Sequence, residues 1–93
     1  MDYRTGEGSD THQLVEGTPL IIGGVSIPFN KGSKGHSDGD VLFHAIVDAL
    51  LGSVGLGDIG SHFSSNDDKW LGANSKIFLK HAFDLIKKEG YLI

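Results

Sequence analysis

The stretch GDVLFHAIVDALLG (residues 39–52) contains the strongest helix signal in this chain of 93 residues. Its apolar side chains recur at helical spacing, and the terminal Gly52 fits a C-terminal stop. We expect a helix from about Gly39 to Leu51. Ser37 is the candidate N-cap, and Asp40 three residues later takes the place of the acid in a capping box.

Three polar residues of this helix, Asp40, His44 and Asp48, are spaced four apart and therefore share one face. A histidine that binds a metal normally donates its other ring N–H to a carboxylate or a carbonyl. Asp48, one turn after His44, is placed by the sequence to accept that N–H and so to orient the ring. The alternative is a solvated acidic face, because charged helix faces usually lie in water.

Before this helix, LIIGGVSI (residues 20–27) predicts a β-hairpin. Two runs with β-branched residues flank a Gly-Gly pair, which accepts the positive φ angles of a tight primed turn. Pro28 ends the second strand. Residues 30–39 are polar and rich in glycine, so we expect a loop that is most mobile from Asn30 to Gly35.

After it, a second helix is expected from about Ser75 to Lys88, capped by Asn74 or Ser75. Lys87 and Lys88 in its last turn complement the helix dipole. Its apolar stripe consists of Ile77, Phe78, Ala82, Leu85 and Ile86. The chain then stops within a strand-like segment, so the sequence looks cut. The order of elements predicts an α+β fold, a sheet with helices packed on one face, with a hairpin at residues 20–28 and truncation before the later strands.

The composition excludes several classes of protein. A net charge of −4 argues against nonspecific binding of nucleic acid. No apolar run is long enough to span a membrane, and the polar N-terminus lacks a signal peptide. With no cysteine, the chain has neither disulfides nor thiolate sites. We expect a bacterial cytoplasmic or organelle-matrix location, with no secretion and no membrane partner.

Asp10 and His12 form an Asp-x-His pair near the start of the chain. In an extended segment their side chains project to one side. His44 could close a face around one metal ion, and two imidazoles with one carboxylate suit zinc. Three protein ligands leave a fourth tetrahedral position open, which is typical of a catalytic or substrate-binding metal. The alternative is that three common residues never meet in space.

Several motifs together resemble one family, 2-C-methyl-D-erythritol 2,4-cyclodiphosphate synthase of the non-mevalonate isoprenoid pathway. The opening Arg4-Thr5-Gly6-Glu7-Gly8-Ser9-Asp10-Thr11-His12 is similar to the family's Arg-x-Gly-x-Gly-x-Asp-x-His. The later matches, in the family's order, are the hairpin at 21–28, His36-Ser37-Asp38-Gly39-Asp40 with His44, Asp48-Ala49-Leu50-Leu51-Gly52, and Gly57-Asp58-Ile59-Gly60.

The resemblance implies a homotrimeric, metal-dependent phosphorus–oxygen lyase with active sites between subunits. Its substrate would be 4-diphosphocytidyl-2-C-methyl-D-erythritol 2-phosphate, a cytidine diphosphate derivative. The 2-phosphate attacks the β-phosphorus and CMP leaves, giving the cyclic diphosphate. Zinc, or another divalent transition metal, would be held by Asp10, His12 and His44, and a second divalent metal, Mg²⁺ or Mn²⁺, is expected in the full-length enzyme.

The resemblance also assigns roles to residues outside the metal set. His36 would be the catalytic residue that stabilises charge in the transition state. The implied substrate-binding residues are Asp10, His12, His36, Ser37, Asp58, Ile59, Gly60, Phe63 and Asp67.

Two departures from the family matter. The family usually has Phe-Pro-Asp-Thr-Asp where this chain has Phe63-Ser64-Ser65-Asn66-Asp67, so Ser65 replaces the first acid. The resemblance also covers only the N-terminal part of a single synthase domain, which we assign to residues 1–93. The missing part would contain the cytidine pocket and a glutamate ligand of the second metal. The alternatives to an enzyme are therefore a catalytically incomplete metal-binding fragment and a non-enzymatic interaction module.

Overall fold

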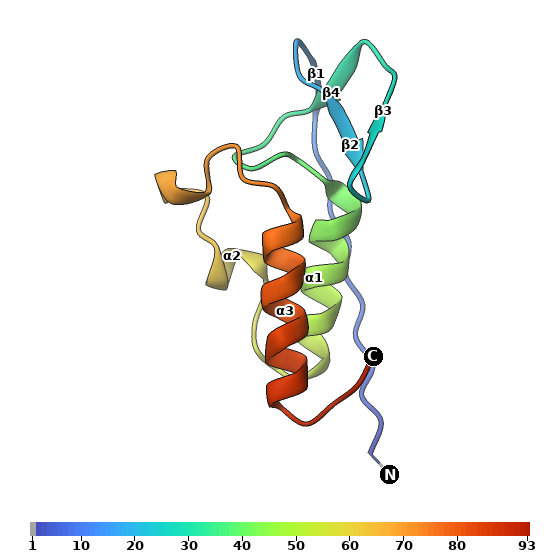
Figure 1. The fold of residues 1–93 in the computed structure, drawn as a ribbon, viewed down its shortest axis with the longest axis vertical. Coiled ribbons are helices and arrows are strands. Elements are labelled where there is room, and N and C mark those ends of the chain that lie inside the picture. The colour runs from blue at the N-terminus through green and yellow to red at the C-terminus, as the bar shows by residue number, and fades with distance from the viewer. Residues whose placement is uncertain (1) are drawn as a thin grey trace.

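The computed structural model describes residues 2–93 and confirms the α+β class. Two long helices lie side by side, and four short strands gather beyond one end of them (Figure 1). The helices are α1 (Val41–Ser53) and α3 (Lys76–Lys88). A short helix, α2 (Ile59–His62), and a 3-10 turn, η1 (Asp68–Trp70), lie in the connection between them.

The strands form two separate antiparallel pairs. β1 (Leu14–Glu16) pairs with β4 (Lys31–Ser33), and β2 (Leu20–Ile22) pairs with β3 (Val25–Ile27). The expected combination of a small antiparallel sheet with helices is confirmed, in the form of these two strand pairs. Strands of three residues offer little apolar surface, so α1 and α3 bury their apolar faces mainly against each other.

The hairpin is confirmed, with Gly23 and Gly24 at φ angles of 62° and 76°. Positive φ at both central residues is the requirement of a type I′ turn, which glycine meets without steric cost. The loop predicted for residues 30–39 is wrong in its first part, because Lys31–Ser33 is strand β4. Its polar, glycine-containing sequence has no strand pattern, and main-chain pairing with β1 is what makes it a strand.

The N-cap of α1 is Asp40 and not Ser37, so the predicted capping box is wrong. The helix also continues past Gly52 to Ser53. It ends where Gly55 adopts a φ of 71°, with the Leu56 N–H donating to the Leu51 carbonyl at 2.9 Å. This is the Schellman arrangement, in which a left-handed glycine terminates the helix.

Asp40 joins the hairpin to the helix. Its carboxylate accepts the N–H of Phe43 at 3.1 Å, as an N-cap should, and also the N–H groups of Gly23 and Gly24 at 2.9 and 2.7 Å. The residue is fully buried. One side chain thus satisfies backbone donors of two elements and fixes their relative position.

The second predicted helix is confirmed as α3, and Lys87 and Lys88 lie in its last turn. Its buried residues are Phe78, Ala82 and Ile86, spaced four apart. Ile77 is half exposed, so its place in the apolar stripe was wrong, because one residue turns about 100° around a helix. The core cluster consists of Val47, Leu51, Phe63, Phe78 and Ala82. No helix within residues 2–93 is long and apolar enough to cross a bilayer.

The N-terminal segment runs along α1 in the opposite direction (Figure 1). Its backbone lies against the helix at two glycines. A Cβ at Gly6 would lie 2.1 Å from the carbonyl oxygen of Ala49, and one at Gly8 would lie 2.1 Å from that of Ala45. Neither position has room for a side chain, so these glycines set how closely the segment approaches the helix.

We predict that Asp40→Ala destabilises the protein by about 3 kcal/mol, because it removes an N-cap and leaves three partly buried N–H groups without their partner. The free energy of unfolding in a urea titration measures the effect. Asp67→Ala is the matched control, since Asp67 caps only the exposed 3-10 turn. Equal losses for the two variants would contradict the linking role of Asp40.

Candidate metal centre

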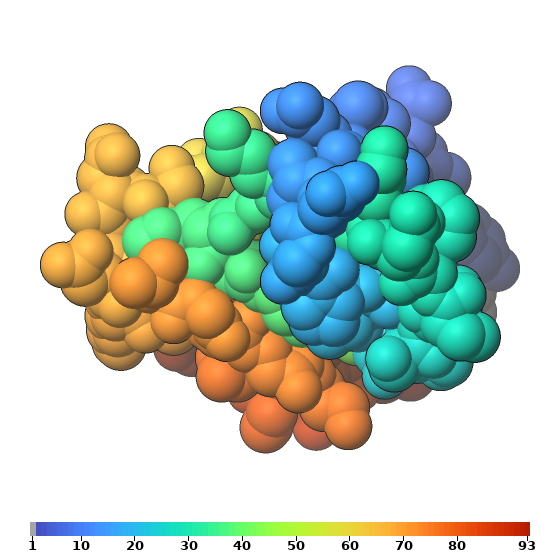
Figure 2. All heavy atoms as spheres, turned by 90° about the horizontal axis from the view of Figure 1, so that it is seen from above, coloured from blue at the N-terminus to red at the C-terminus, as the bar shows by residue number. Residues whose placement is uncertain are grey.

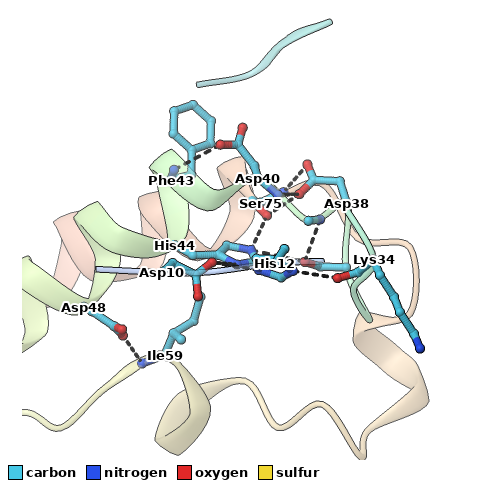
Figure 3. Close-up of polar contacts among 12 residues, drawn as sticks. Asp10, His12, Lys34, Asp38, Asp40, Phe43, His44, Asp48, Ile59 and Ser75 are labelled. Carbon is cyan, nitrogen blue, oxygen red and sulfur yellow. Dashed lines mark hydrogen bonds and ion pairs between the residues drawn. The ribbon is translucent and has the colours of Figure 1, made fainter. Parts of the chain in front are cut away.

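Three side chains converge from two remote segments, namely Asp10 and His12 of the N-terminal segment and His44 of α1 (Figure 3). The Asp10 Oδ2 atom lies 2.7 Å from His12 Nε2 and 3.2 Å from His44 Nδ1. One candidate ligand atom from each residue lies within 4.8 Å of the other two. The trio predicted from the sequence therefore does meet in space.

His12 is held from behind by a backbone carbonyl. Its Nδ1 lies 2.7 Å from the carbonyl oxygen of Lys34, the residue that follows β4. Since that nitrogen must donate to the carbonyl, a neutral ring has its lone pair on Nε2, which faces Asp10. A carbonyl in this position is a usual outer partner of a metal-binding histidine.

His44 is held from behind by hydroxyls, so the predicted contact with Asp48 is wrong. Its Nε2 atom lies 2.7 Å from Ser75 Oγ and 3.2 Å from Ser37 Oγ. Ser75 stands directly before α3, at the position where that helix is capped. His44 itself is buried, with 8% of its surface exposed.

Asp48 bonds elsewhere, although residues four apart on a helix can meet. Both ring nitrogens of His44 already have other partners, Ser75 and Ser37 at Nε2 and Asp10 at Nδ1. The Asp48 carboxylate instead accepts the N–H of Ile59 at 2.8 Å (Figure 3). It therefore fixes the start of α2, which borders the site. The alternative that Asp40 and Asp48 form a solvated face is also wrong for Asp40, which is buried.

The donor set fits a divalent transition metal. Two neutral imidazole nitrogens and one carboxylate oxygen make three ligands, which is the number found in catalytic zinc sites. If both imidazoles are neutral, their lone pairs and the carboxylate would converge without a cation between them. Asp10, His12 and His44 could therefore hold a metal ion.

The trio lies at one side of a cavity of about 210 Å³. Seen from the strand end, residues 34–40 (green) lie between the N-terminal segment (blue) and the α2–η1 connection (yellow to orange) (Figure 2). The cavity is lined by Asp10, His12, His36, Ser37, His44, Ile59, Gly60, Phe63, Ser65, Trp70 and Phe78. It thus collects residues from every segment around the trio.

Five of the residues with predicted roles outside the trio line this cavity, namely His36, Ser37, Ile59, Gly60 and Phe63. The side chains of Asp58 and Asp67 serve as caps. Asp58 caps α2, and its bonds to the hydroxyl and the N–H of Ser61 hold the pKa of this exposed carboxyl below its usual value. Asp67 caps η1, while its carbonyl oxygen lies 2.7 Å from His36 Nε2.

Sequence reasoning missed the aromatic wall of the cavity. The Phe63 ring packs against the tilted ring of Phe78 and edge-to-face against Trp70, with ring centroids 4.5 and 5.0 Å apart. Phe78 was predicted only as a core residue. For Trp70, no sequence pattern indicated that it lines the cavity and is not merely part of a loop. Ser65, noted as a departure from the family, is also part of the lining. The replaced acid was the available signal that this position faces the site.

The fold and the site define a class: an α+β protein with a candidate metal centre open to a small cavity. Residues 3–93 match the model of the YgbB family, and the chain belongs to this family. The resemblance to 2-C-methyl-D-erythritol 2,4-cyclodiphosphate synthases is confirmed. The protein of that name from Burkholderia cenocepacia (strain HI2424) is 56% identical over all 93 residues.

Solved structures agree. A structure described as 2C-methyl-D-erythritol-2,4-cyclodiphosphate synthase has a TM-score of 0.87 and 47% identity over 94% of this chain. A CDP-bound form has a TM-score of 0.85, also with 47% identity over 94% of this chain. The chain spans 58% of the length of the Burkholderia relative and 58% of each of these two solved chains.

We predict that the purified protein binds one zinc ion per chain through the trio, with ligand distances of about 2.0–2.2 Å. His44→Ala should weaken binding by at least about 100-fold, since loss of a ligand should cost more than loss of an outer partner. Zinc titration and X-ray absorption measure both quantities. His81→Ala, at an exposed histidine of α3, should leave the affinity unchanged. Equal affinity of the two variants would exclude the trio as the site.

We predict a different outcome for Asp48→Ala. The change leaves the Ile59 N–H without its partner and should cost about 1–2 kcal/mol of stability. Zinc affinity should stay within about threefold of the unaltered protein. Losses of about 10–100-fold are expected only for residues that bond to a metal ligand, and Asp48 bonds to Ile59 instead. A tenfold loss of zinc affinity would return Asp48 to the role that the sequence first indicated.

Proposed function

We propose that this chain forms the N-terminal part of a single-domain 2-C-methyl-D-erythritol 2,4-cyclodiphosphate synthase. The enzyme would convert 4-diphosphocytidyl-2-C-methyl-D-erythritol 2-phosphate into the cyclic diphosphate and release CMP, a lyase reaction of isoprenoid biosynthesis. The observation that carries the proposal is the convergence of Asp10, His12 and His44 beside the cavity. The 56% identity to a relative of this name supports it.

The reaction needs positioning and charge neutralisation more than covalent help from the protein. A zinc ion at the trio would supply a Lewis-acidic contact for a phosphate oxygen. The protein groups would place the phosphates: Ser37 offers a hydroxyl at the cavity wall, and His36 offers an imidazole whose Nε2 is already held by the Asp67 carbonyl. With Nε2–H donating to that carbonyl, a protonated ring would stabilise developing negative charge through Nδ1–H without reorganising first.

The other side of the cavity would hold the methylerythritol part of the substrate. Ile59 and Gly60 lie at the start of α2, where Asp48 and Asp58 accept backbone N–H bonds. Phe63 contributes to the apolar wall with Trp70. This combination of one polar, ligand-bearing side and one apolar side suits a small phosphorylated polyol.

Three further features belong to the proposal for the whole enzyme. It would be a homotrimer, and it would bind a small-molecule substrate. It would also bind a second divalent metal, Mg²⁺ or Mn²⁺. Asp58 and Asp67, whose carboxylates are caps here, would contact substrate in the assembled enzyme. A solved relative with 47% identity is described as a CDP-bound form, which is consistent with a cytidine diphosphate derivative as substrate.

The alternative is a metal-binding fragment that cannot catalyse the reaction. It keeps the trio but lacks the cytidine pocket and the second metal's glutamate that the family resemblance assigns to later residues. The chain's 58% coverage of its relative favours testing this alternative directly. Zinc binding without turnover by the 93-residue chain would support it.

We predict that a protein extended to the full length of the relatives releases CMP from the substrate only when divalent metal is present. His36→Ala should slow release by about 10²-fold or more, the usual cost of removing one electrostatic stabiliser. The 93-residue chain should show no release. Turnover is followed by phosphorus NMR or by CMP quantification. Robust turnover by the short chain would exclude the fragment alternative, and no turnover by the long protein with metal bound would exclude the enzyme assignment.

A further inference from the structure

Ser75 stands at the N-cap of α3 but does not cap it. Serine is among the best N-cap residues, because its hydroxyl usually accepts an N–H of the first turn. Here the Asn74 side chain takes that role and accepts the N–H of Lys76 at 2.9 Å. Ser75 is fully buried, and its hydroxyl is directed to two other groups.

Those two groups are the His44 ring, 2.7 Å from Oγ at Nε2, and the carboxylate of Asp38. A hydroxyl has one proton to donate, and a carboxylate can only accept. The Ser75 proton therefore goes to Asp38. Asp38 is further held by two backbone donors, the N–H of Asp40 at 3.1 Å and the N–H of Ser75 at 2.9 Å.

With its proton committed to Asp38, Ser75 Oγ can only accept from His44. A proton of His44 must then sit on Nε2, and in the neutral ring the lone pair is left on Nδ1. That nitrogen is the one 3.2 Å from the Asp10 carboxylate. The chain of donors thus runs from His44 through Ser75 to Asp38 and selects one tautomer of the histidine.

We propose that Ser75 is a positioning residue of the metal centre, which fixes the Nε2–H tautomer of His44 through the carboxylate of Asp38 and so aims the Nδ1 lone pair at the metal. This inference rests on the metal site of the proposed function. His12 is aimed by a different device, the Lys34 carbonyl at its Nδ1, with the opposite ring nitrogen left free. Both free nitrogens face the same carboxylate oxygen of Asp10.

A purely structural role for Ser75 is the competing explanation, because the same hydroxyl ties Asp38 to the start of α3. The two explanations differ in what they predict for metal. A structural role lowers stability and leaves metal affinity alone, whereas a positioning role changes affinity beyond any change in stability.

The first test compares zinc affinity and thermal stability in three variants of the protein. Ser75→Ala should weaken zinc binding by about 10–100-fold. Ser75→Thr keeps the hydroxyl and should stay within about threefold of the unaltered protein, by the same reasoning. Asn74→Ala removes the actual cap of α3, so it should lower the melting temperature without changing zinc affinity. Unchanged affinity in Ser75→Ala would overturn the proposal.

The second test does not depend on any variant folding. Long-range nitrogen–proton NMR spectra of the histidine rings, recorded on the unaltered protein with and without zinc, report which nitrogen of His44 carries the proton. We expect Nε2 in both states. A proton on Nδ1, or zinc bound through Nε2, would overturn the proposal. Neither test uses turnover, so a failed CMP-release assay would count against the proposed reaction and not against Ser75.

Discussion

The carboxylate of Asp40 is the interaction on which the arrangement of this molecule depends. It receives backbone N–H groups from the first turn of α1 and from both glycines of the hairpin turn, and no part of it reaches solvent. A buried carboxylate is costly unless its oxygens are fully used, and here three donors meet that requirement. Folding the hairpin and starting the helix are thereby coupled, since neither element alone satisfies the charge.

The same cap sets the phase of α1. Because the helix begins at Val41, His44 falls in its first turn and points back toward the strands and the N-terminal segment. Asp38, two residues before the cap, bonds to Ser75 and brings the start of α3 to the same place. The starts of both long helices are therefore held next to the candidate metal centre, and this fixes the positions of the side chains around it.

The sequence was most informative where a local pattern permitted only one structure. The Gly-Gly turn, the two long helices and the Asp-x-His pair each carried local signals, and the structure confirms the elements and the convergence of Asp10, His12 and His44. The sequence was misleading where one spacing is compatible with two different sets of contacts. A separation of four residues puts His44 and Asp48 on one face, but His44 bonds to Ser75 and Asp48 bonds to the N–H of Ile59, a tertiary choice that the spacing does not encode.

Other features had no local signal. β4 exists because β1 pairs with it, and at the centre of the pair Gly32 lies opposite Val15, which is 17 residues earlier in the chain. The bond from Ser75 to His44 spans 31 residues and uses a serine whose sequence context predicts an ordinary cap. Contacts of this kind follow from the tertiary arrangement, which spacing along the chain does not encode.

The two glycines that lie on α1 have a further consequence for the metal ligands. Two residues of extended chain advance about 6.6–6.8 Å, and four residues of helix advance about 6 Å, so the two repeats nearly match. Gly6 meets Ala49 and Gly8 meets Ala45, one step apart in each repeat. Two residues further along the N-terminal segment, and one turn earlier in α1, the same match brings Asp10 to the turn that contains His44. The position of Asp10 along α1 therefore depends on how the N-terminal segment and the helix match in length. A side chain at Gly6 or Gly8 would shift the backbone of that segment, and Asp10 with it.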